Sequence, residues 1–442
     1  MKYLLVQPST RITGAVEVPG DKSISHRAIM LGAVATGTTR VRGFLPGEDC
    51  LATLAAVEAM GVRVQRRAAT EVAIEGVGLR GLQRPAHDLD MGNSGTAMRL
   101  FAGLLAGQAF DCTLVGDASL SKRPMERVAQ PLRRMGAGIE TDNGRPPLRI
   151  RGGAPLRGID CTLPVASAQV KSALLLAGLY ASGETTVHEP AVTRDHTERM
   201  LAVFGQPVRR EGLSVALAPA GRLQGTDVEV PGDLSSATFL ILAAALAREG
   251  SLTIGNVGLN PTRTGILEIF RLMGMDLAVE PADVPPGAEP VGRITVRPSQ
   301  LRGTVIPAAL VPLAIDEFPA VFVAAALAEG ETVVSGAAEL RHKESDRIAV
   351  MAAGLRALGI GVSETPDGAR IQGGPLAGGE VDSVGDHRIA MAFAVGASRA
   401  HAAVRILDTA NVATSFPGFA ALVGQIGMRV EERGGGDGDA RG

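Results

Sequence analysis

Cations gather in the sequence where a polar loop turns into an apolar helix. Asp21-Lys-Ser-Ile-Ser-His-Arg27 places Lys22 and Arg27 on either side of a helix start that we predict at Ser23. A cation in the first turn opposes the helix dipole, so a bound anion such as a phosphate explains this pair better than capping alone. A solvated pair of surface charges is the alternative.

A second group of candidates lies in two loops further along the chain. Gly92-Asn-Ser-Gly-Thr96 is a glycine-rich loop entering a helix, where Gly95 would let a ligand approach the backbone closely. Arg123 stands before Pro124, which we expect in the first turn of a helix, a suitable position for a cation that binds an anion. Each of these motifs is weak by itself.

The most charged segment of the chain is Arg341-His-Lys-Glu-Ser-Asp-Arg347. Lys343 and Arg347 are four residues apart, so on a helix they would share a face, with Glu344 beside them. This pattern suits a carboxylate held among the phosphates of a substrate, although a charge run is more commonly a solvated face. Asp386-His-Arg388 brings a further cation to a helix start.

These motifs fall within six copies of one repeated unit. Each copy opens an apolar helix with a polar residue, continues into a β-rich run and ends a second helix at a glycine. The helix openings are Ser23, Asn93, Ser167, Ser235, Asp316 and Asp386, and the glycines are Gly61, Gly136, Gly205, Gly274, Gly359 and Gly427. The glycines recur about every 70 residues, and each is typical of a helix C-cap. The openings could be simple N-caps, which is the interpretation that we favour for Ser235 and Asp386.

The repeats predict two α/β domains of three units each. The hexapeptide Val16-Glu-Val-Pro-Gly-Asp21 recurs as Val228-Glu-Val-Pro-Gly-Asp233, and we expect the chain to cross between domains at both copies. The predicted domains are therefore 21–230 and 1–20 plus 231–430, with a disordered tail at 433–442.

Composition narrows the class of function. Lys and Arg total 44 against 46 Asp and Glu, so no global positive field attracts a polyanion, and the absence of Trp leaves few surfaces for stacking on bases. We expect no nucleic-acid partner. Three widely spaced cysteines favour reduced thiols, and the N-terminus resembles neither a signal peptide nor a membrane span. We therefore expect a cytoplasmic protein that does not bind membranes.

Taken in order, the motifs resemble those of the enolpyruvyl transferase family, and of its shikimate-pathway branch in particular. The matching segments are Asp21–Arg27, Gly92–Arg99, Lys122–Pro124, Lys343–Arg347 and Asp386–Arg388. Three others, Pro164–Ser172, Thr193–Thr197 and Ala413–Pro417, are similar to the second class of that branch. The resemblance implies a two-domain fold in which each domain is an inside-out α/β barrel of three βαβαββ repeats, in agreement with the six units counted above.

The resemblance also implies a reaction, the transfer of the enolpyruvyl group of phosphoenolpyruvate to the 5-hydroxyl of shikimate 3-phosphate. The residues implied for shikimate 3-phosphate are Lys22, Ser23, Arg27, Ser167, Ala168, Gln169, Arg194, Asp316 and Lys343. Those implied for phosphoenolpyruvate are Lys22, Gly95, Arg123, Gln169, Arg347 and Arg388. Asp316 would act on the hydroxyl and Glu344 on the methylene carbon, although Asp316 could instead be a plain N-cap.

Further expectations follow from the resemblance. No cofactor or metal is expected, because guanidinium and ammonium groups already neutralise the phosphates, and a monomer is expected. Glyphosate, which occupies the phosphoenolpyruvate site in this family, should fit beside Gly95. The shikimate-pathway branch has two classes, and Thr414 stands where the first class has a Lys that contacts phosphoenolpyruvate. We expect another cation to compensate for the missing Lys, without predicting which one.

Two rival functions stay open on the sequence alone. One is the related transferase that acts on UDP-N-acetylglucosamine, but the chain lacks that enzyme's reactive Cys in Gly116–Pro124 and has Lys22-Ser23 in place of its Lys-Asn. The other is a non-catalytic anion-binding scaffold, against which the presence of Asp316 and Glu344 argues.

Overall fold

The computed structural model describes residues 1–219, 221–285 and 287–434, and the chain divides into two compact units. Unit 1 comprises Met1–Pro19, Gly232–Asp283 and the chain from Pro290 on, and unit 2 comprises Gly20–Pro231 and Val284–Glu289. The predicted disordered tail, residues 433–442, lies outside the described residues from 435 on.

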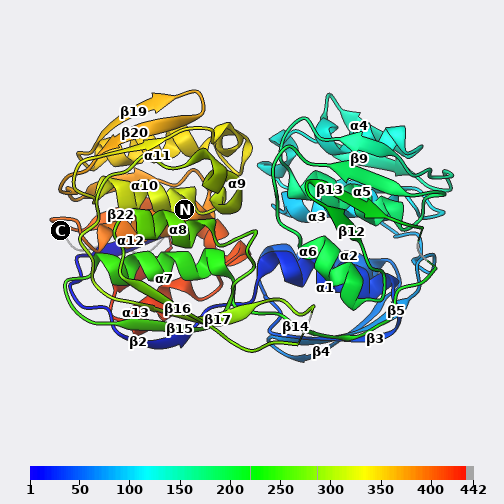
Figure 1. The fold of residues 1–442 in the computed structure, drawn as a ribbon, viewed down its shortest axis with the longest axis horizontal. Helices are drawn as coiled ribbons and strands as arrows, with labels where there is room; N and C mark the ends of the chain where they lie inside the picture. The colour runs from blue at the N-terminus through cyan, green and yellow to red at the C-terminus, as the bar shows by residue number, and fades with distance from the viewer. Residues whose placement is uncertain (220, 286, 435–442) are drawn as a thin grey trace. The chain divides into compact units, whose positions relative to one another are not determined.

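Unit 2 contains six α-helices and three small sheets within the described residues (Figure 1). The helices are α1 (Lys22–Val34), α2 (Glu48–Ala59), α3 (Gly95–Leu105), α4 (Glu126–Arg134), α5 (Ala168–Gly178) and α6 (His196–Val203). The strands are β3 (Thr36–Arg42), β4 (Arg63–Ala68), β5 (Glu71–Val77), β6 (Leu89–Asp90), β7 (Cys112–Val115), β8 (Gly138–Asp142), β9 (Arg145–Arg151), β10 (Asp160–Thr162), β11 (Thr185–His188), β12 (Arg209–Glu211), β13 (Ser214–Leu217) and β14 (Asp227–Glu229).

Unit 1 has the same kind of architecture in its described part. Its helices are α7 (Leu234–Leu246), α8 (Gly265–Leu272), α9 (Val311–Ala314), α10 (Phe318–Ala326), α11 (Arg347–Ala357), α12 (His387–Ala397) and α13 (Phe419–Gln425). Its strands are β1 (Tyr3–Gln7), β2 (Gly14–Glu17), β15 (Leu252–Gly258), β16 (Leu277–Pro281), β17 (Val291–Val296), β18 (Glu331–Val334), β19 (Gly361–Thr365), β20 (Gly368–Gln372), β21 (Gly379–Asp382), β22 (Val404–Leu407) and β23 (Arg429–Arg433).

The sheets repeat one pattern of strand pairing. In the sheet β6-β7-β9-β8, the first pair is parallel and the next two pairs are antiparallel, and the sheets led by β10, β14, β2 and β21 pair in the same way. In the sheet β18-β20-β19, parallel bridges at Arg302 and Val305 stand in the place of the fourth strand. The six repeats predicted from the sequence are therefore present as βαβαββ units.

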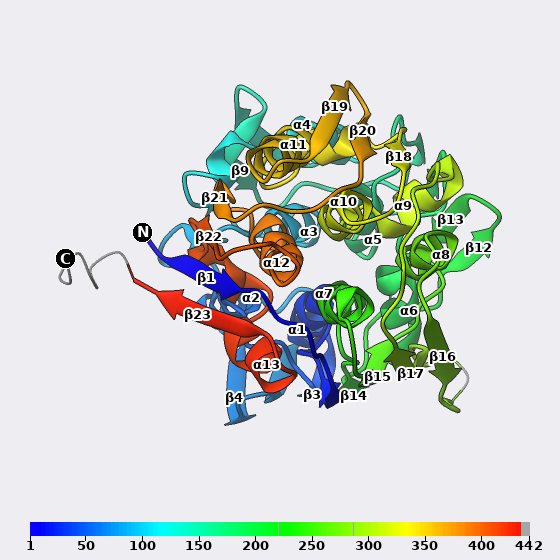
Figure 2. The ribbon, with the colours of Figure 1, turned by 90° about the vertical axis from the view of Figure 1, so that its left-hand side faces the viewer.

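Three apolar helices form the interior of each unit. In unit 1 these are α7, α10 and α12, which Figure 2 shows nearly end-on and side by side, with the strands of this unit around them. Every residue of α7 is buried, which explains why its sequence is apolar on all faces. In unit 2, α3 packs against α5, and α1 contacts α3 and α6. Because the apolar turns are buried, the polar residues of these helices are confined to their N-terminal ends.

The second helix of each unit ends as the sequence predicts. Gly61, Gly136, Gly205, Gly274, Gly359 and Gly427 all follow a helix C-cap residue and have φ between 85° and 112°. Glycine adopts this left-handed conformation without the steric cost of a Cβ atom, which explains why glycine recurs at these six positions.

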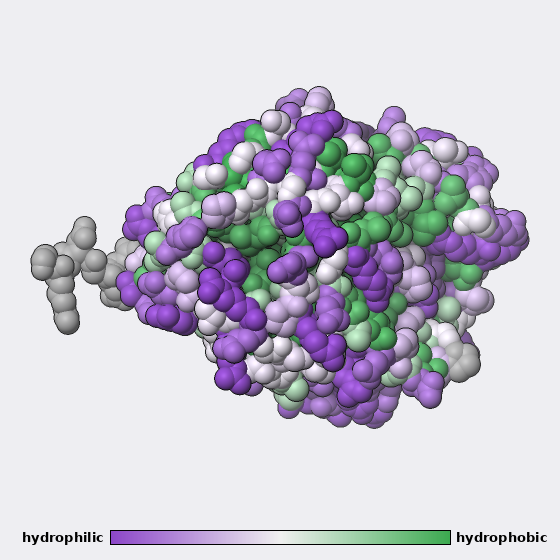
Figure 3. All heavy atoms as spheres, turned by 60° about the vertical axis from the view of Figure 1, so that its left-hand side comes forward, coloured by the Kyte–Doolittle hydropathy of each residue, from purple (hydrophilic) through white to green (hydrophobic). Residues whose placement is uncertain are grey.

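The surface is mainly hydrophilic on the face drawn in Figure 3, where apolar side chains show between the polar ones. In the described ranges, no helix is long and apolar enough to cross a membrane.

Candidate functional site

The polar helix openings differ in detail from the sequence prediction. Asp21, Ser94 and Asp233 cap α1, α3 and α7, instead of Ser23, Asn93 and Ser235. Ser167 caps α5 and Asp386 caps α12, as predicted. The N-cap position of α10 is Glu317, so Asp316 is not the N-cap of this helix. The remaining polar residues at these openings are therefore not needed for capping.

In unit 2, the N-terminal turns of α1, α3 and α5 meet. The Arg27 guanidinium is buried and donates hydrogen bonds to Ser172 Oγ of α5 at 2.8 Å and to Thr197 Oγ1 of α6 at 2.7 Å. Lys22, one turn earlier, forms an ion pair with Asp49 of α2. Two predicted anion-binding cations are thus fixed beside one helix N-terminus, where backbone N–H groups add to their positive field.

The glycine-rich loop and the arginine after η1 (Leu120–Lys122) form the other half of this cluster. Arg123 is 6% exposed, and its Nη2 atom lies 2.5 Å from Asn93 Oδ1. Gln169 accepts a hydrogen bond from Arg99 Nη1 at 2.9 Å and donates one to Thr96 Oγ1 at 2.9 Å. The loop that begins α3 therefore lies against two buried arginines.

The prediction that Arg123 directly precedes a helix is wrong. Pro124 does not occupy the first turn of a helix, because α4 begins at Glu126 with Met125 as its N-cap. Arg123 lies in the connection between η1 and α4, and its side chain is held by Asn93 and by Ser119 Oγ at 3.3 Å. Its position thus depends on contacts with Asn93, 30 residues before it, and with the nearby Ser119, rather than on a helix of its own.

Arg194 lies half-buried in the loop before α6, and the residue before it, Thr193, contacts a buried ion-pair cluster. Lys171 Nζ, fully buried, lies 3.0 Å from Glu189 Oε2 and 2.7 Å from Glu198 Oε1, and Thr193 donates a hydrogen bond to Glu189. The residue preceding Arg194 is therefore tied to α5 through paired buried charges, which are costly to break.

His26 joins the starts of α1 and α3 and gives a pH-dependent prediction. Its Nδ1 lies 2.7 Å from Thr53 Oγ1 and its Nε2 lies 3.4 Å from Ser94 Oγ. Burial, and then the charges of Lys22 and Arg27, lower the pKa of His26 well below 6.5. Since the unfolded chain binds the proton more readily, stability that is present above pH 6.5 is lost as the pH falls below it. The free energy of unfolding should therefore fall through this residue as the pH is lowered in that range, by roughly one kcal/mol per pH unit at most.

Urea unfolding between pH 5 and 7.5 measures this effect. The His26→Gln variant should show a shallower dependence on pH than the wild type below pH 6.5. An equal slope in both proteins would mean that His26 protonates as easily in the folded chain as in the unfolded one.

In unit 1, the buried Arg347 forms ion pairs with three carboxylates. Arg347 is 1% exposed; its Nε lies 2.8 Å from Asp386 Oδ2, its Nη2 lies 2.6 Å from Glu344 Oε2 and its Nη1 lies 3.5 Å from Asp316 Oδ1. Burial by itself would lower the pKa of Arg347, but the attraction of Asp386, Glu344 and Asp316 raises it above its usual value. The two predicted acid–base carboxylates thus share one permanently charged guanidinium.

Lys343 and Arg388 complete this cluster. Lys343 Nζ lies 3.2 Å from Asp316 Oδ1, and Arg388 Nη1 donates to the Asp316 carbonyl oxygen at 3.1 Å. The prediction that Lys343 and Arg347 share a helix face is wrong, because α11 begins at Arg347, after its N-cap Asp346. The two cations meet at Asp316 because the chain turns between η3 (Ala338–His342) and α11.

The Thr414 side chain forms a hydrogen bond within its own turn. It ends η4 (Ala410–Thr414), is 3% exposed, and its hydroxyl donates to the Asn411 carbonyl at 2.7 Å. The position thus supplies a local hydrogen bond where the family's first class has a cation.

Several residues that hold the candidate site together were not assigned a role from the sequence. These are Asp49, Thr96, Arg99, Ser172 and Thr197 in unit 2, and Asp386 as a partner of Arg347 in unit 1. Arg99 could have been found, since it stands one helical turn after Gly95 and its Nη1 donates to the Gly95 carbonyl at 3.2 Å. The others depend on contacts between distant segments.

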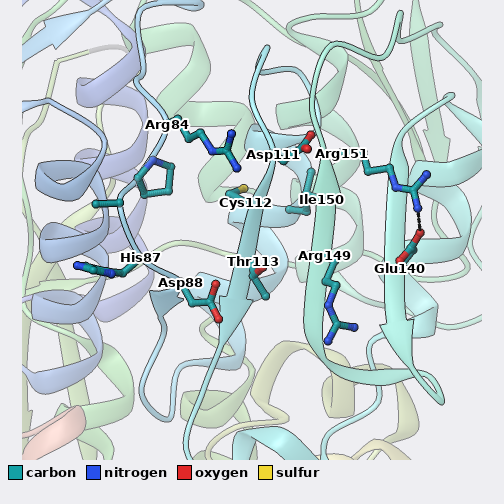
Figure 4. Close-up of a pocket in the computed structure, with 12 residues that line it drawn as sticks. Arg84, His87, Asp88, Asp111, Cys112, Thr113, Glu140, Arg149, Ile150 and Arg151 are labelled. Carbon is teal, nitrogen blue, oxygen red and sulfur yellow. Dashed lines mark hydrogen bonds and ion pairs between the residues drawn. The ribbon is translucent and has the colours of Figure 1, made fainter.

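A separate hollow of about 400 Å³ lies over β7 and β9 of unit 2 (Figure 4). It contains none of the predicted site residues, and Figure 4 shows arginines and carboxylates on neighbouring strands, with Arg151 paired to Glu140. Burial, and then the charge of Asp111, raise the pKa of the Cys112 thiol at its wall to about 12, so this cysteine is no nucleophile at neutral pH. Among the described residues, no group of three or more His, Cys, Asp or Glu is placed to hold a metal ion.

Each unit by itself has groups that suit the binding of phosphate or carboxylate anions. Both units carry cations at the N-terminal ends of apolar helices, and in unit 1 two carboxylates, Asp316 and Glu344, pair with the buried Arg347.

Comparison with known proteins identifies the family. The profile of EPSP synthase (3-phosphoshikimate 1-carboxyvinyltransferase) matches residues 6–422. The chain is 58% identical to the 3-phosphoshikimate 1-carboxyvinyltransferase of Alkalilimnicola ehrlichii over 99% of this chain and 97% of the relative, and 60% identical to that of Halorhodospira halophila over 96% of each. The fold is similar to EPSP synthase from Acinetobacter baumannii, with a TM-score of 0.87 and 52% identity over 98% of this chain and 100% of that one. The chain belongs to the EPSP synthase family, and the predicted family and fold are confirmed.

Proposed function

We propose that the protein transfers the enolpyruvyl group of phosphoenolpyruvate to the 5-hydroxyl of shikimate 3-phosphate and releases inorganic phosphate. This step belongs to the biosynthesis of chorismate and the aromatic amino acids. The observation that supports it most is the arrangement around Arg347, where Asp316 and Glu344 contact different nitrogens of one buried guanidinium. An anion-binding scaffold has no use for two such carboxylates, whereas a reaction that moves two protons requires them.

The cations support binding of the two substrates. We assign shikimate 3-phosphate to Lys22, Ser23, Arg27, Ser167, Ala168, Gln169, Arg194, Asp316 and Lys343, and phosphoenolpyruvate to Lys22, Gly95, Arg123, Gln169, Arg347 and Arg388. Arginine suits phosphate and carboxylate groups because its planar guanidinium donates two parallel hydrogen bonds. The hydrogen bonds of Arg27 and Arg123 described above reduce the side-chain entropy that is lost when a ligand binds.

The proposed mechanism gives each carboxylate its own proton, that of the 5-hydroxyl for Asp316 and that of the methylene carbon for Glu344. Asp316 accepts the proton of the 5-hydroxyl as its oxygen attacks the central carbon of phosphoenolpyruvate, and Glu344 donates a proton to the methylene carbon. The resulting tetrahedral intermediate then loses phosphate, which takes the proton held by Asp316, while the methyl carbon returns a proton to Glu344. The carbon–carbon double bond forms again, now as the enol ether of the product. An anion that draws Arg347 away from Glu344 would leave the carboxyl group more readily protonated, as a general acid requires.

The setting of the reaction is also a proposal. The three cysteines, Cys50, Cys112 and Cys161, are free and buried, which fits a reducing cytoplasm, and we expect the enzyme to act as a monomer.

A phosphate-release assay tests the proposal. Purified protein with phosphoenolpyruvate and shikimate 3-phosphate should release phosphate with a kcat in the usual range of about 1–10³ per second. UDP-N-acetylglucosamine in place of shikimate 3-phosphate should give no release. Release with the UDP-sugar alone would support the rival transferase, and release with neither acceptor would favour a scaffold without activity.

Gly95→Ala tests the phosphoenolpyruvate half of the site. A Cβ atom at this position would lie 2.7 Å from Arg99 Nη1 and 3.1 Å from Arg123 Nη1, so the Arg99 guanidinium must shift and that of Arg123, which we assign to phosphoenolpyruvate, must also give way slightly. We expect the KM for phosphoenolpyruvate to rise about tenfold, because a displaced arginine binds the ligand less well. Inhibition by glyphosate should weaken as well. Gly424→Ala, where nothing lies within 4 Å of an added Cβ, is the control and should leave both values unchanged.

A further inference from the structure

A buried glutamate next to Asp316 has no part in the mechanism above. Glu317 is 1% exposed and occupies the N-cap position of α10, yet its side chain accepts no hydrogen bond from the first turn of that helix. Glutamate is not among the residues preferred at an N-cap. Since burying a carboxylate is costly unless it is paired, capping does not explain why Glu317 is here.

The partners of Glu317 come from three separate segments of unit 1. Its Oε1 atom accepts a hydrogen bond from Ser235 Oγ of α7. The same oxygen lies 3.5 Å from Arg388 Nη1 of α12 and 3.7 Å from Arg263 Nη2, in the loop before α8. The starts of α7, α10 and α12, helices that lie side by side in Figure 2, are thereby joined at one carboxylate.

Arg263, the second arginine beside Glu317, is also bound to residues at the start of α7. Arg263 is 3% exposed, and its Nη2 lies 3.1 Å from Asp233 Oδ1 and 2.6 Å from Ser235 Oγ. Asp233 is itself the N-cap of α7. Arg263 therefore fixes Ser235 and Glu317 to a helix end whose backbone is already in place, and the carboxylate has little freedom to move.

Arg388 is the member of the group that we assign to the substrate. Its guanidinium is held by the Asp316 carbonyl at 3.1 Å and by Glu317 at 3.5 Å. Charge attraction from a buried carboxylate restricts the rotamers of a long side chain and so lowers the entropy lost on binding. The hydrogen bond from Arg388 to the Asp316 carbonyl also holds the backbone of Asp316, the proposed acceptor of the hydroxyl proton.

We propose that Glu317 is a positioning residue for the reaction, which orients Arg388 toward phosphoenolpyruvate and fixes the backbone of Asp316 through the network Asp233–Arg263–Ser235–Glu317. The inference rests on the proposed function, because its effect is expressed through the binding of phosphoenolpyruvate. Glu317 itself touches no reacting atom, and its role is carried by Arg388.

Steady-state kinetics of Glu317→Gln test the role. This substitution keeps the shape and removes the charge, and kcat/KM for phosphoenolpyruvate should fall about 10–100-fold, the usual cost of a misplaced substrate-binding group. The KM for shikimate 3-phosphate should change less than threefold. Glu317→Asp keeps the charge and should recover part of the loss. Ser235→Ala, which removes only the hydroxyl that holds the carboxylate, should give a smaller effect of the same kind.

A double-mutant cycle separates positioning from a merely structural role. In an Arg388→Met background, Glu317→Gln should lower kcat/KM for phosphoenolpyruvate no further, because the residue acts through the arginine that has been removed. Additive losses, or equal changes in the KM values of both substrates, would overturn the inference. If the wild type turns over and Glu317→Gln matches it, the positioning role is wrong and the proposed function stands. If the wild type shows no turnover, the proposed function fails and the inference fails with it.

Discussion

Glu344→Gln should lower kcat by roughly 10²–10⁴-fold, the usual contribution of a general acid, while the KM values change little. Gln keeps the shape and can still accept the hydrogen bond that Arg347 Nη2 donates to Glu344 Oε2 at 2.6 Å. What it cannot do is carry a proton to the methylene carbon of phosphoenolpyruvate. The loss should therefore appear in the chemical step rather than in substrate binding, which rapid-quench measurement of a single turnover resolves.

The matched control is Glu331→Gln in the same unit. Glu331 is exposed on β18 and lies 2.9 Å from Arg370, an ion pair of the kind that contributes little. Its kcat should stay within twofold of the wild type. A Glu344→Gln enzyme with normal kcat would assign the proton donor to another group and would contradict the role given to this carboxylate.

Arg347→Met should destabilise unit 1 by about 3–5 kcal/mol, because it removes the counter-ion of the buried Asp386 carboxylate and one cation from the partly exposed Glu344 and Asp316. Asp386 is 0% exposed and cannot turn to solvent. For a unit of this size, the expected loss corresponds to a fall of roughly 6–20 °C in the Tm. Differential scanning calorimetry of the two proteins gives the comparison directly.

Arg370→Met removes an exposed arginine from the same unit and should move the Tm by less than about 2 °C. If the Arg347→Met variant had the same Tm as this control, the three carboxylates would have to find sufficient partners without Arg347. That result would contradict the role of Arg347 as their shared counter-ion, whatever the activity of the variant.

The repeated fold could be predicted from the sequence because its signals are local. Gly61 and its five counterparts are needed for a left-handed C-cap, and no other residue type takes that conformation as readily. The apolar helices between them have no polar face, so they had to be interior. Periodicity and cap chemistry together thus determined the number and order of the repeats.

Helix starts were less predictable than helix ends. At α1, α3 and α7, several polar residues in a row can cap, and the choice of Asp21, Ser94 and Asp233 depends on where the apolar face must begin. The prediction for Lys343 failed for a related reason, since a charged run gives no apolar period from which to place the first turn. Boundaries at such ends are set by tertiary packing.

The residues that support the site could not be found from spacing. Arg27 meets Thr197, 170 residues further along the chain, and Glu317 meets Ser235, 82 residues before it. Serine and threonine are common residues, and nothing in their immediate neighbourhood indicates a partner. Such pairs come together only when the helices of a unit pack against one another.

The most direct test of the central claim is the structure of the product that the wild-type protein makes. Phosphoenolpyruvate and shikimate 3-phosphate, incubated with the protein and analysed by ¹H and ³¹P NMR, should yield an enolpyruvyl ether at the 5-hydroxyl together with one inorganic phosphate for each ether. Unchanged substrates, or phosphate released without the ether, would contradict the assignment of two cation clusters and two carboxylates to enolpyruvyl transfer.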